Sequence, residues 1–443
     1  MSYGHHPDAR LTLKVGRRSW LFFLFLTAVF FVNYHDLSNN YHNLSNVRGG
    51  RDSYNASVDD ITSSIDKGSI VRRITLLSLG IVAIVSLVHD RTNRRLRVDS
   101  PLGWLLLGFV VWAFISPIWA EDLALTLRRL AVFGILCIAA VAVARRLSLR
   151  EIILFTFFST TLGLFVGIAA EVLYGTFRPF TFGYRFAGSL HPNGQGIECG
   201  LLVLSALAAA DLGKRWRAFF RACAFLGFVF LILTWSRTAI AAAILTLVGY
   251  LVAVGSRRLK IAMAYSFSIF FCLLLLFLGA GLLPGLKSAI QLGRDDAGDA
   301  DSFNGRTMVW EDVGYYIRQR PILGYGYCGF WTPAHIRAVS DEENWAVPDG
   351  HSTYIDYLVS LGIVGLVAYT FLLFAGIRRA FRFHRLSRNS AFAFCGALLV
   401  FFALDGFLES ALFEGSLIMF LCMVVLVRLA FLCWQEAIRV ANP

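Results

Sequence analysis

Long runs of apolar residues limit what this chain can fold into more than any other feature of its sequence. The clearest runs are 201–210, 222–233, 261–283 and 363–376. A helix that crosses the hydrocarbon core of a bilayer needs about 20 predominantly apolar residues, and several runs approach or reach that length. Of the 443 residues, 57% are hydrophobic and 16% are charged. A soluble protein of this size carries more charge, and its apolar residues form separated stripes. The sequence therefore predicts an integral membrane protein.

Twelve segments fit transmembrane helices, so the predicted fold is an all-α polytopic membrane protein. The first segment is not followed by a small-residue cleavage site, which favours a membrane helix over a signal peptide. The predicted helices are 19–33, 70–89, 101–119, 128–144, 151–174, 194–210, 218–234, 238–254, 261–283, 351–376, 391–409 and 411–434. Two long hydrophilic connections, 33–69 and 284–350, separate some of them, and the first is interpreted as a solvated loop.

The basic residues predict the orientation of the chain in the membrane. Alternate connections carry clusters of Lys and Arg, which together hold more than half of the 41 such residues, at 10–18, 91–97, 145–150, 214–221, 257–260 and 378–388. The positive-inside rule places such clusters in the cytoplasm. We therefore predict a cytoplasmic tail 1–18, a single transmembrane domain 19–434 with periplasmic loops 33–69 and 284–350, and a cytoplasmic tail 435–443. The net charge of +12 then reflects membrane anchoring more than nucleic-acid binding.

The sequence gives little support for a disulfide, a metal or a cofactor. Seven of the eight cysteines fall in predicted helices, and Cys328 alone lies in an outer loop without an obvious partner. The chain has no CxxC and no HxxxH spacing. The acidic run of Asp295, Asp296, Asp299 and Asp301 is interpreted as a mobile acidic loop, because hard cations need several preset oxygen ligands.

The second long loop is predicted to contain a surface helix over 306–319. Asn304 is the expected cap, and Pro321 ends the helix. Gly324 and Gly326 follow among aromatic residues, where they allow tight turns of the backbone.

Three arginines, Arg185, Arg237 and Arg306, are predicted to face outward, against the positive-inside bias. Ionisable groups held near the bilayer without an anchoring role are functional candidates, although Arg237 also fits a snorkelling residue at a helix end. The planar guanidinium matches phosphate oxygens two at a time, so three convergent arginines would suit a diphosphate. The spacing in the sequence does not bring them together, and the fold must do so.

His351 is the predicted general base. It begins a predicted helix beside Asp349 and Asp356, and a neutral His that a carboxylate orients can accept a proton near pH 7. His191 is the weaker candidate, because His-Pro-Asn-Gly is typical of a turn that leads into a helix. Candidate residues for binding the acceptor or the glycan are His191, Asn193, Tyr354, Glu409 and Glu414, and the two glutamates fit solvated turn residues equally well.

Several motifs resemble the O-antigen ligase and polysaccharide polymerase superfamily. They are Gly-Arg-Thr-Met-Val-Trp at 305–310, Pro-Ile-Leu-Gly-Tyr-Gly at 321–326, Trp-Ala-Glu-Asp at 119–122, His-Pro-Asn at 191–193 and Ser-Arg at 236–237. His351-Ser352, nine further residues and Gly362-x-x-Gly365 also fit that family's pattern of His, then Asn, Ser or Gln, nine residues and Gly-x-x-Gly. The resemblance covers about 74–434. The run from Gly324 to Trp331 is most similar to the exopolysaccharide-production branch.

The resemblance implies a membrane glycosyltransferase of the GT-C type in the bacterial inner membrane, with a periplasmic active site. Such enzymes transfer a glycan from an undecaprenyl-diphosphate carrier to an acceptor hydroxyl. Arg185 and Arg306 match the functional arginines of the family, Arg237 is the candidate third, and His351 matches its essential histidine. Direct attack by the acceptor would invert the anomeric carbon, and no metal is expected. Chain-length regulator proteins are candidate partners, and nucleic acid is not expected.

The sequence leaves the acceptor open. A polymerase uses another carrier-linked repeat unit, a ligase uses the lipid A–core, and we favour the polymerase on the similarity of the Gly-Tyr-Gly-Tyr run. A lipid-linked oligosaccharide flippase is the rival from another class, but the two related halves that are typical of transporters are absent from the sequence. A purely structural scaffold leaves the outward Arg and His residues unexplained.

Overall fold

The computed structural model is helical throughout the part of the chain that it describes, with no β-strand there. The described residues are 17–34, 57–89, 96–181, 183–213, 215–256, 258, 260–261, 306–343, 345–410 and 416–431. The predicted helix 261–283, the acidic run from Asp295 to Asp301, Glu414 and both predicted tails fall almost entirely outside them.

Helices are present at eleven of the twelve predicted positions. They are α1 (Arg17–Tyr34), α4 (Ile70–Val88), α5 (Pro101–Ile115, continued by η1, Ser116–Ile118), α6 (Leu123–Arg146), α7 (Leu149–Leu173), α8 (Pro192–Ala210), α9 (Arg217–Leu233), α10 (Arg237–Val254), α15 (Thr353–Ser387), α16 (Ser390–Asp405) and α17 (Leu417–Phe431). Side-chain caps define several starts, such as the capping box of Ser148 with Glu151 at α7. The long helix α15 runs well past its predicted end at 376.

Six helices in the described part are long and apolar enough to cross a membrane. They are α4, α5 with η1, α6, α7, α10 and α15, whereas α1, α16 and α17 are apolar but shorter. Large apolar side chains such as Trp104, Phe225 and Phe374 are exposed on the outside of the bundle, as expected of a surface that faces lipid. The structure therefore supports a polytopic membrane protein, and the count of twelve crossings and the orientation of the ends stay predictions.

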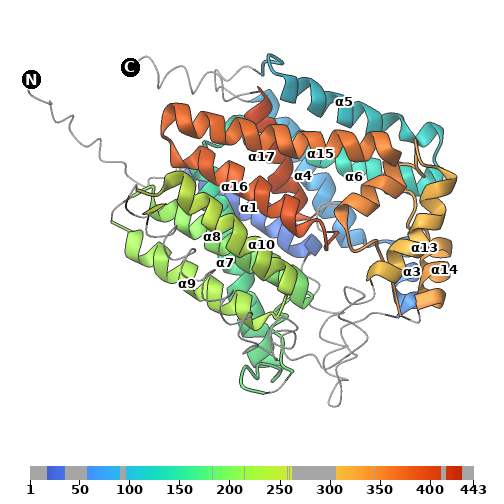
Figure 1. Cartoon of the computed structure of the whole chain (residues 1–443), viewed down its shortest axis with the longest axis horizontal. Helices are drawn as coiled ribbons and strands as arrows, with labels where there is room; N and C mark the ends of the chain where they lie inside the picture. Colours follow the sequence, from blue (N-terminus) through green and yellow to red (C-terminus); the bar gives the residue numbers. More distant parts are fainter. Residues whose placement is uncertain are drawn as a thin grey trace, which may run out of the picture.

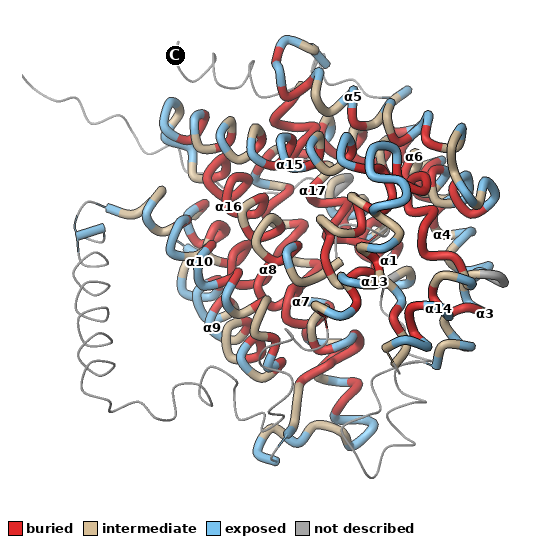
Figure 2. Tube along the Cα trace, turned by 45° about the vertical axis from the view of Figure 1, so that its right-hand side comes forward, coloured by how far each residue is buried: buried red, intermediate tan, exposed pale blue. Residues whose placement is uncertain are grey.

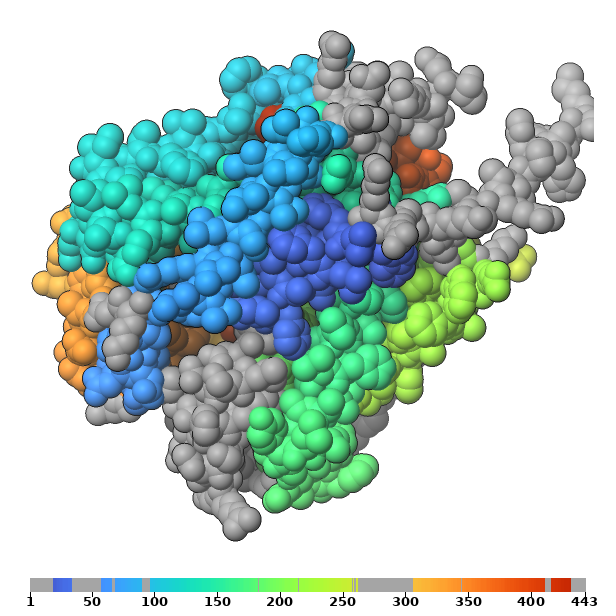
Figure 3. Space-filling view, turned by 180° about the vertical axis from the view of Figure 1, so that it is seen from behind, coloured from blue at the N-terminus to red at the C-terminus, as the bar shows by residue number. Residues whose placement is uncertain are grey.

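The centre of the bundle is formed by α8, α16 and α17. Figure 2 shows their traces as mostly buried, and nearly every residue of α17 lies in the interior. Helices α9 and α10 pack beside α8 on one side of this centre, and α5 packs against α15 on the other (Figure 1). From behind, α1 lies between α4 and α7 (Figure 3).

Three further helices form a cap beside the bundle: α13 (Arg306–Gln319), α14 (Pro333–Glu343) and α3 (Val58–Lys67) (Figure 1). Helix α13 has the predicted bounds and buries Val309 and Val313. Helix α3 lies in the first long connection, so the described part of that predicted loop includes a helix. It packs on α14, where the Arg337 guanidinium donates to Thr62 Oγ1 at 3.2 Å.

The two glycine motifs of the sequence, at 321–326 and 362–365, meet in a single contact. Gly362 interrupts α15 with φ of 66°, a conformation that residues with a side chain rarely adopt. The backbone of the 321–326 segment crosses there, because Ile363 N–H donates to Pro321 O at 2.9 Å and Tyr325 N–H donates to Val359 O at 3.0 Å. A Cβ at Gly362 would lie 2.0 Å from Ile322 O.

We expect Gly362→Ala to destabilise the protein by about 3 kcal/mol or more, because it adds both backbone strain and a backbone overlap. Thermal unfolding of the detergent-solubilised protein measures this. Gly108→Ala is the matched control, since a Cβ at Gly108 within α5 meets no atom within 4 Å. Wild-type stability of the Gly362→Ala protein would contradict the crossing described here.

Candidate active site

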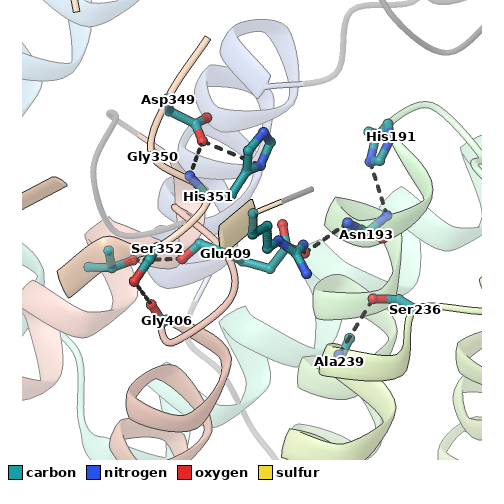
Figure 4. A network of polar contacts seen from close by, with 12 residues as sticks. His191, Asn193, Ser236, Ala239, Asp349, Gly350, His351, Ser352, Gly406 and Glu409 are labelled. Atoms are coloured by element: carbon teal, nitrogen blue, oxygen red, sulfur yellow. Dashed lines mark hydrogen bonds and ion pairs between the residues drawn. The ribbon is translucent and has the colours of Figure 1, made fainter. Parts of the chain in front are cut away.

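Two of the predicted arginines are linked to one carboxylate, Glu409: Arg306 directly and Arg185 through Asn193. An Arg185 guanidinium N–H donates to Asn193 Oδ1 at 2.9 Å, and Asn193 Nδ2 donates to Glu409 Oε1 at 2.8 Å. Arg306 donates to the same Glu409 oxygen at 2.7 Å. Figure 4 shows Glu409, in the loop after α16, and Asn193, at the start of α8, pointing toward each other. The tertiary structure thus joins a loop before α8, the start of α8, the start of α13 and the loop after α16.

Glu409 is a central, sheltered member of this network. Its side chain is 13% exposed, so the interpretation as a solvated turn residue is wrong. Burial raises the pKa of Glu409 to about 7, although the charges of Arg306 and Arg185 lower it. Its backbone carbonyl accepts from Thr353 N–H and Thr353 Oγ1, which ties the loop after α16 to the start of α15.

His351 lies just before α15 and is held from two sides. Its backbone N–H donates to Asp349 Oδ1 at 2.9 Å, and its ring Nδ1 lies 3.6 Å from the same oxygen. The ring stacks on Trp345 with the centroids 5.3 Å apart. Among the described residues, Nε2 of His351 is buried and has no hydrogen-bond partner. Burial lowers the pKa of His351, Asp349 opposes this and Arg306 adds to it, so the ring is neutral at pH 7.

Asp356 does not contact His351, contrary to what its place in the sequence suggests. Its Oδ1 accepts from Gly350 N–H at 2.9 Å and Trp331 Nε1 at 2.8 Å, and Ser410 Oγ donates to Oδ2. Asp349 is therefore the carboxylate beside His351. Asp356 joins the segment just before His351 to those of Trp331 and Ser410.

His191 caps α8, which agrees with its interpretation as a turn residue. Its Nδ1 accepts from Asn193 N–H at 3.3 Å. Desolvation by the surrounding protein lowers the pKa of His191 to about 4, and the charges of Arg185 and His351 add to this. His191 therefore lies close to both Arg185 and His351. Its part in binding a glycan stays a prediction.

Arg237 is half-buried as the first residue of α10. The turn before it is attached to the network, because Arg185 Nε donates to Thr234 O at 3.1 Å. Helix α8 also packs closely on this turn, where a Cβ at Gly196 would lie 3.0 Å from the Ser236 Cβ. A third diphosphate contact from Arg237 stays a prediction.

Other residues from the sequence motifs have structural contacts. The Tyr354 hydroxyl donates to Ala403 O at 3.0 Å and joins α15 to α16, so a glycan contact from it stays a prediction. Trp119 Nε1 donates to Leu323 O at 2.8 Å, which holds the glycine-rich segment against η1. Arg129 donates to Cys328 O at 2.6 Å.

Asp405 at the end of α16 was missed by the sequence reasoning. It is buried, and its Oδ1 has no hydrogen-bond partner among the described residues. A carboxylate within a long apolar run is the signal that could have identified it.

Comparison with known proteins relates part of the chain to a known family. A protein-family model described as "O-Antigen ligase" matches residues 222–370. This segment of the chain is similar to the O-antigen ligase family. It contains Arg237, Arg306, His351 and both glycine motifs, so the resemblance inferred from the O-antigen ligase motifs is confirmed.

A curated protein also resembles the chain. The exopolysaccharide production protein ExoQ of Rhizobium meliloti (strain 1021) is 24% identical over 294 residues. The match covers 61% of this chain and 63% of ExoQ, less than two thirds of either. It therefore supports a relation to surface-polysaccharide proteins.

Proposed function

We propose that this protein is a membrane glycosyltransferase of surface-polysaccharide assembly. It moves a glycan from an undecaprenyl-diphosphate carrier to an acceptor sugar hydroxyl at the periplasmic face of the bacterial inner membrane. The observation that carries the proposal is a pair of arginines linked to Glu409, one directly and one through Asn193, close to a neutral histidine with an unpartnered Nε2. The O-antigen ligase segment and the similarity to ExoQ support the same class of reaction.

The carrier diphosphate binds where Glu409 meets Arg306. Without donor, the Glu409 carboxylate occupies the anion position of that guanidinium. The incoming diphosphate offers more oxygens to Arg306 and Arg185 than one carboxylate does, and bidentate contacts favour it. With a pKa of about 7, Glu409 takes up a proton as the second anion arrives and releases the arginine.

The transfer is a direct displacement. The acceptor hydroxyl oxygen forms a bond to the anomeric carbon, the bond from that carbon to the diphosphate oxygen breaks, and the hydroxyl proton passes to His351 Nε2. Asp349 favours the tautomer with the proton on Nδ1. Arg306 and Arg185 stabilise the charge that develops on the diphosphate, which leaves as an anion. The anomeric configuration is inverted, and the step uses no metal.

A polymerase is the favoured form of this enzyme. The name of ExoQ refers to exopolysaccharide production, and the Gly-Tyr-Gly-Tyr run of this chain is most similar to that branch. The O-antigen ligase description of the matching family supports the second candidate, a ligase that transfers polymer to the lipid A–core.

Deletion of the gene tests the proposal. For a polymerase we expect loss of long chains, with single repeat units retained on the carrier, and restoration by the wild-type gene. For a ligase, complete polymer accumulates on the carrier lipid and is absent from lipid A. Surface polysaccharide of unchanged amount and chain length would refute both candidates. Repeat units trapped on the cytoplasmic side would indicate the flippase.

A further inference from the structure

One buried carboxylate organises the loop that carries Arg185. Glu171 lies in the last turn of α7 and is 2% exposed. Its Oε1 accepts the N–H groups of Ala187 and Gly188, both at 2.9 Å. Its Oε2 accepts the hydroxyl of Tyr184. The three donors lie one residue before Arg185 and two and three residues after it.

The opposite side of this loop is also fixed. Phe186 is fully buried, and its N–H donates to Leu233 O at 2.8 Å. Gly188 has φ of 57° and lies against α7, where a Cβ at Gly167 would be 2.9 Å from its Cα. With the backbone held on both sides, the Arg185 guanidinium can reach Thr234 O and Asn193 Oδ1 together.

We propose that Glu171 is a positioning residue for donor binding, which acts through Arg185 and does not itself touch the substrate. The inference rests on the proposed function, because it assumes that Arg185 contacts the carrier diphosphate. An apolar residue at 171 would leave two buried backbone N–H groups without acceptors, and the loop would rearrange to satisfy them. Arg185 would then lose its fixed direction toward the site, and with it part of its binding energy.

Gln at position 171 should preserve the function. Its amide oxygen can accept from Ala187 and Gly188, and its NH₂ group can donate to the Tyr184 oxygen. Glu171→Gln is therefore the conservative variant that separates hydrogen-bond positioning from a requirement for charge. Tyr184→Phe removes one of the three bonds and should give an intermediate effect.

The experiment measures the Kd of undecaprenyl diphosphate for the full-length protein in lipid nanodiscs. We expect Glu171→Ala to raise the Kd about tenfold, Arg185→Ala to raise it similarly, and the double variant to bind no more weakly than Arg185→Ala alone. Glu171→Gln should bind like the wild type. Tyr250→Phe is the matched control, because it removes a remote hydrogen bond, from Tyr250 to Asp211 at 3.1 Å, and should combine with Arg185→Ala additively.

Three results would overturn the inference. They are a wild-type Kd for Glu171→Ala, a loss in Glu171→Gln as large as in Glu171→Ala, and multiplicative losses in the double variant. If Glu171→Ala fails to fold, Tyr184→Phe and its double variant with Arg185→Ala decide by the same criterion. Absence of binding by the wild-type protein would instead refute the proposed donor site, and the role of Glu171 with it.

Discussion

Replacing His351 with Ala should reduce glycan transfer by about 10²–10⁴-fold, the usual contribution of a general base. The Nε2 atom of His351 is buried and has no hydrogen-bond partner among the described residues, while Nδ1 faces Asp349. Removing the ring leaves the acceptor hydroxyl without its proton acceptor. Transfer from undecaprenyl-diphosphate glycan by the purified protein measures the effect.

Two controls accompany the His351→Ala variant. Its Kd for undecaprenyl diphosphate should be that of the wild type, because the diphosphate contacts come from the arginines. His89→Ala removes an exposed histidine after α4 and should leave transfer unchanged. Normal polymer from cells in which His351→Ala is the sole copy of the protein would show that His351 is not the base.

The pH dependence follows from the same group. Because burial lowers the pKa of His351 below its ordinary value of about 6.5, the neutral, proton-accepting form persists as the pH falls through 6.5. The midpoint of the decline in single-turnover transfer at saturating donor should therefore lie below about pH 6.5. If the transfer rate instead declined with a midpoint above about pH 7, the titrating group would not be His351.

Replacing Arg306 with Lys should lower kcat/KM for the donor by about a hundredfold. Arg306 is 9% exposed at the start of α13, and it is the arginine that directly contacts Glu409. Lys keeps the charge but has a single ammonium group, so it cannot bind two phosphate oxygens side by side. Steady-state transfer at varied donor concentration gives the ratio.

The same helix supplies the control for Arg306. Arg318 is exposed in the last turn of α13, and Arg318→Lys should have full activity. Full activity of Arg306→Lys would indicate that any cation at this position suffices, and that the planar fork has no part in the reaction.

The positions of the helices could be predicted from the sequence because their causes are local. Apolar runs and side-chain caps such as Ser148 act within a few residues, and α13 has the bounds that its cap region and Pro321 imply. The motifs also led to the O-antigen ligase resemblance, since they preserve residue types in order along the chain.

Contacts between distant segments could not be predicted in this way. The crossing of Gly362 by the 321–326 backbone and the direction of Asp356 both depend on elements that are far apart in sequence. Glu409 appeared equally suited to a solvated turn, because nothing near it in the sequence indicates burial against Arg306.

Hydropathy and charge are local properties, so the order of residues alone was enough to predict a many-helix membrane protein with outward-facing Arg and His candidates. The packing of the helices was needed to show that Glu409 links Arg306 to the Asn193 that binds Arg185. It was also needed to show that Asp349 is the carboxylate beside His351 and that Glu171 holds the loop of Arg185. Hydrogen bonds between distant segments depend on how the helices pack against one another, and no short pattern along one chain encodes those distances.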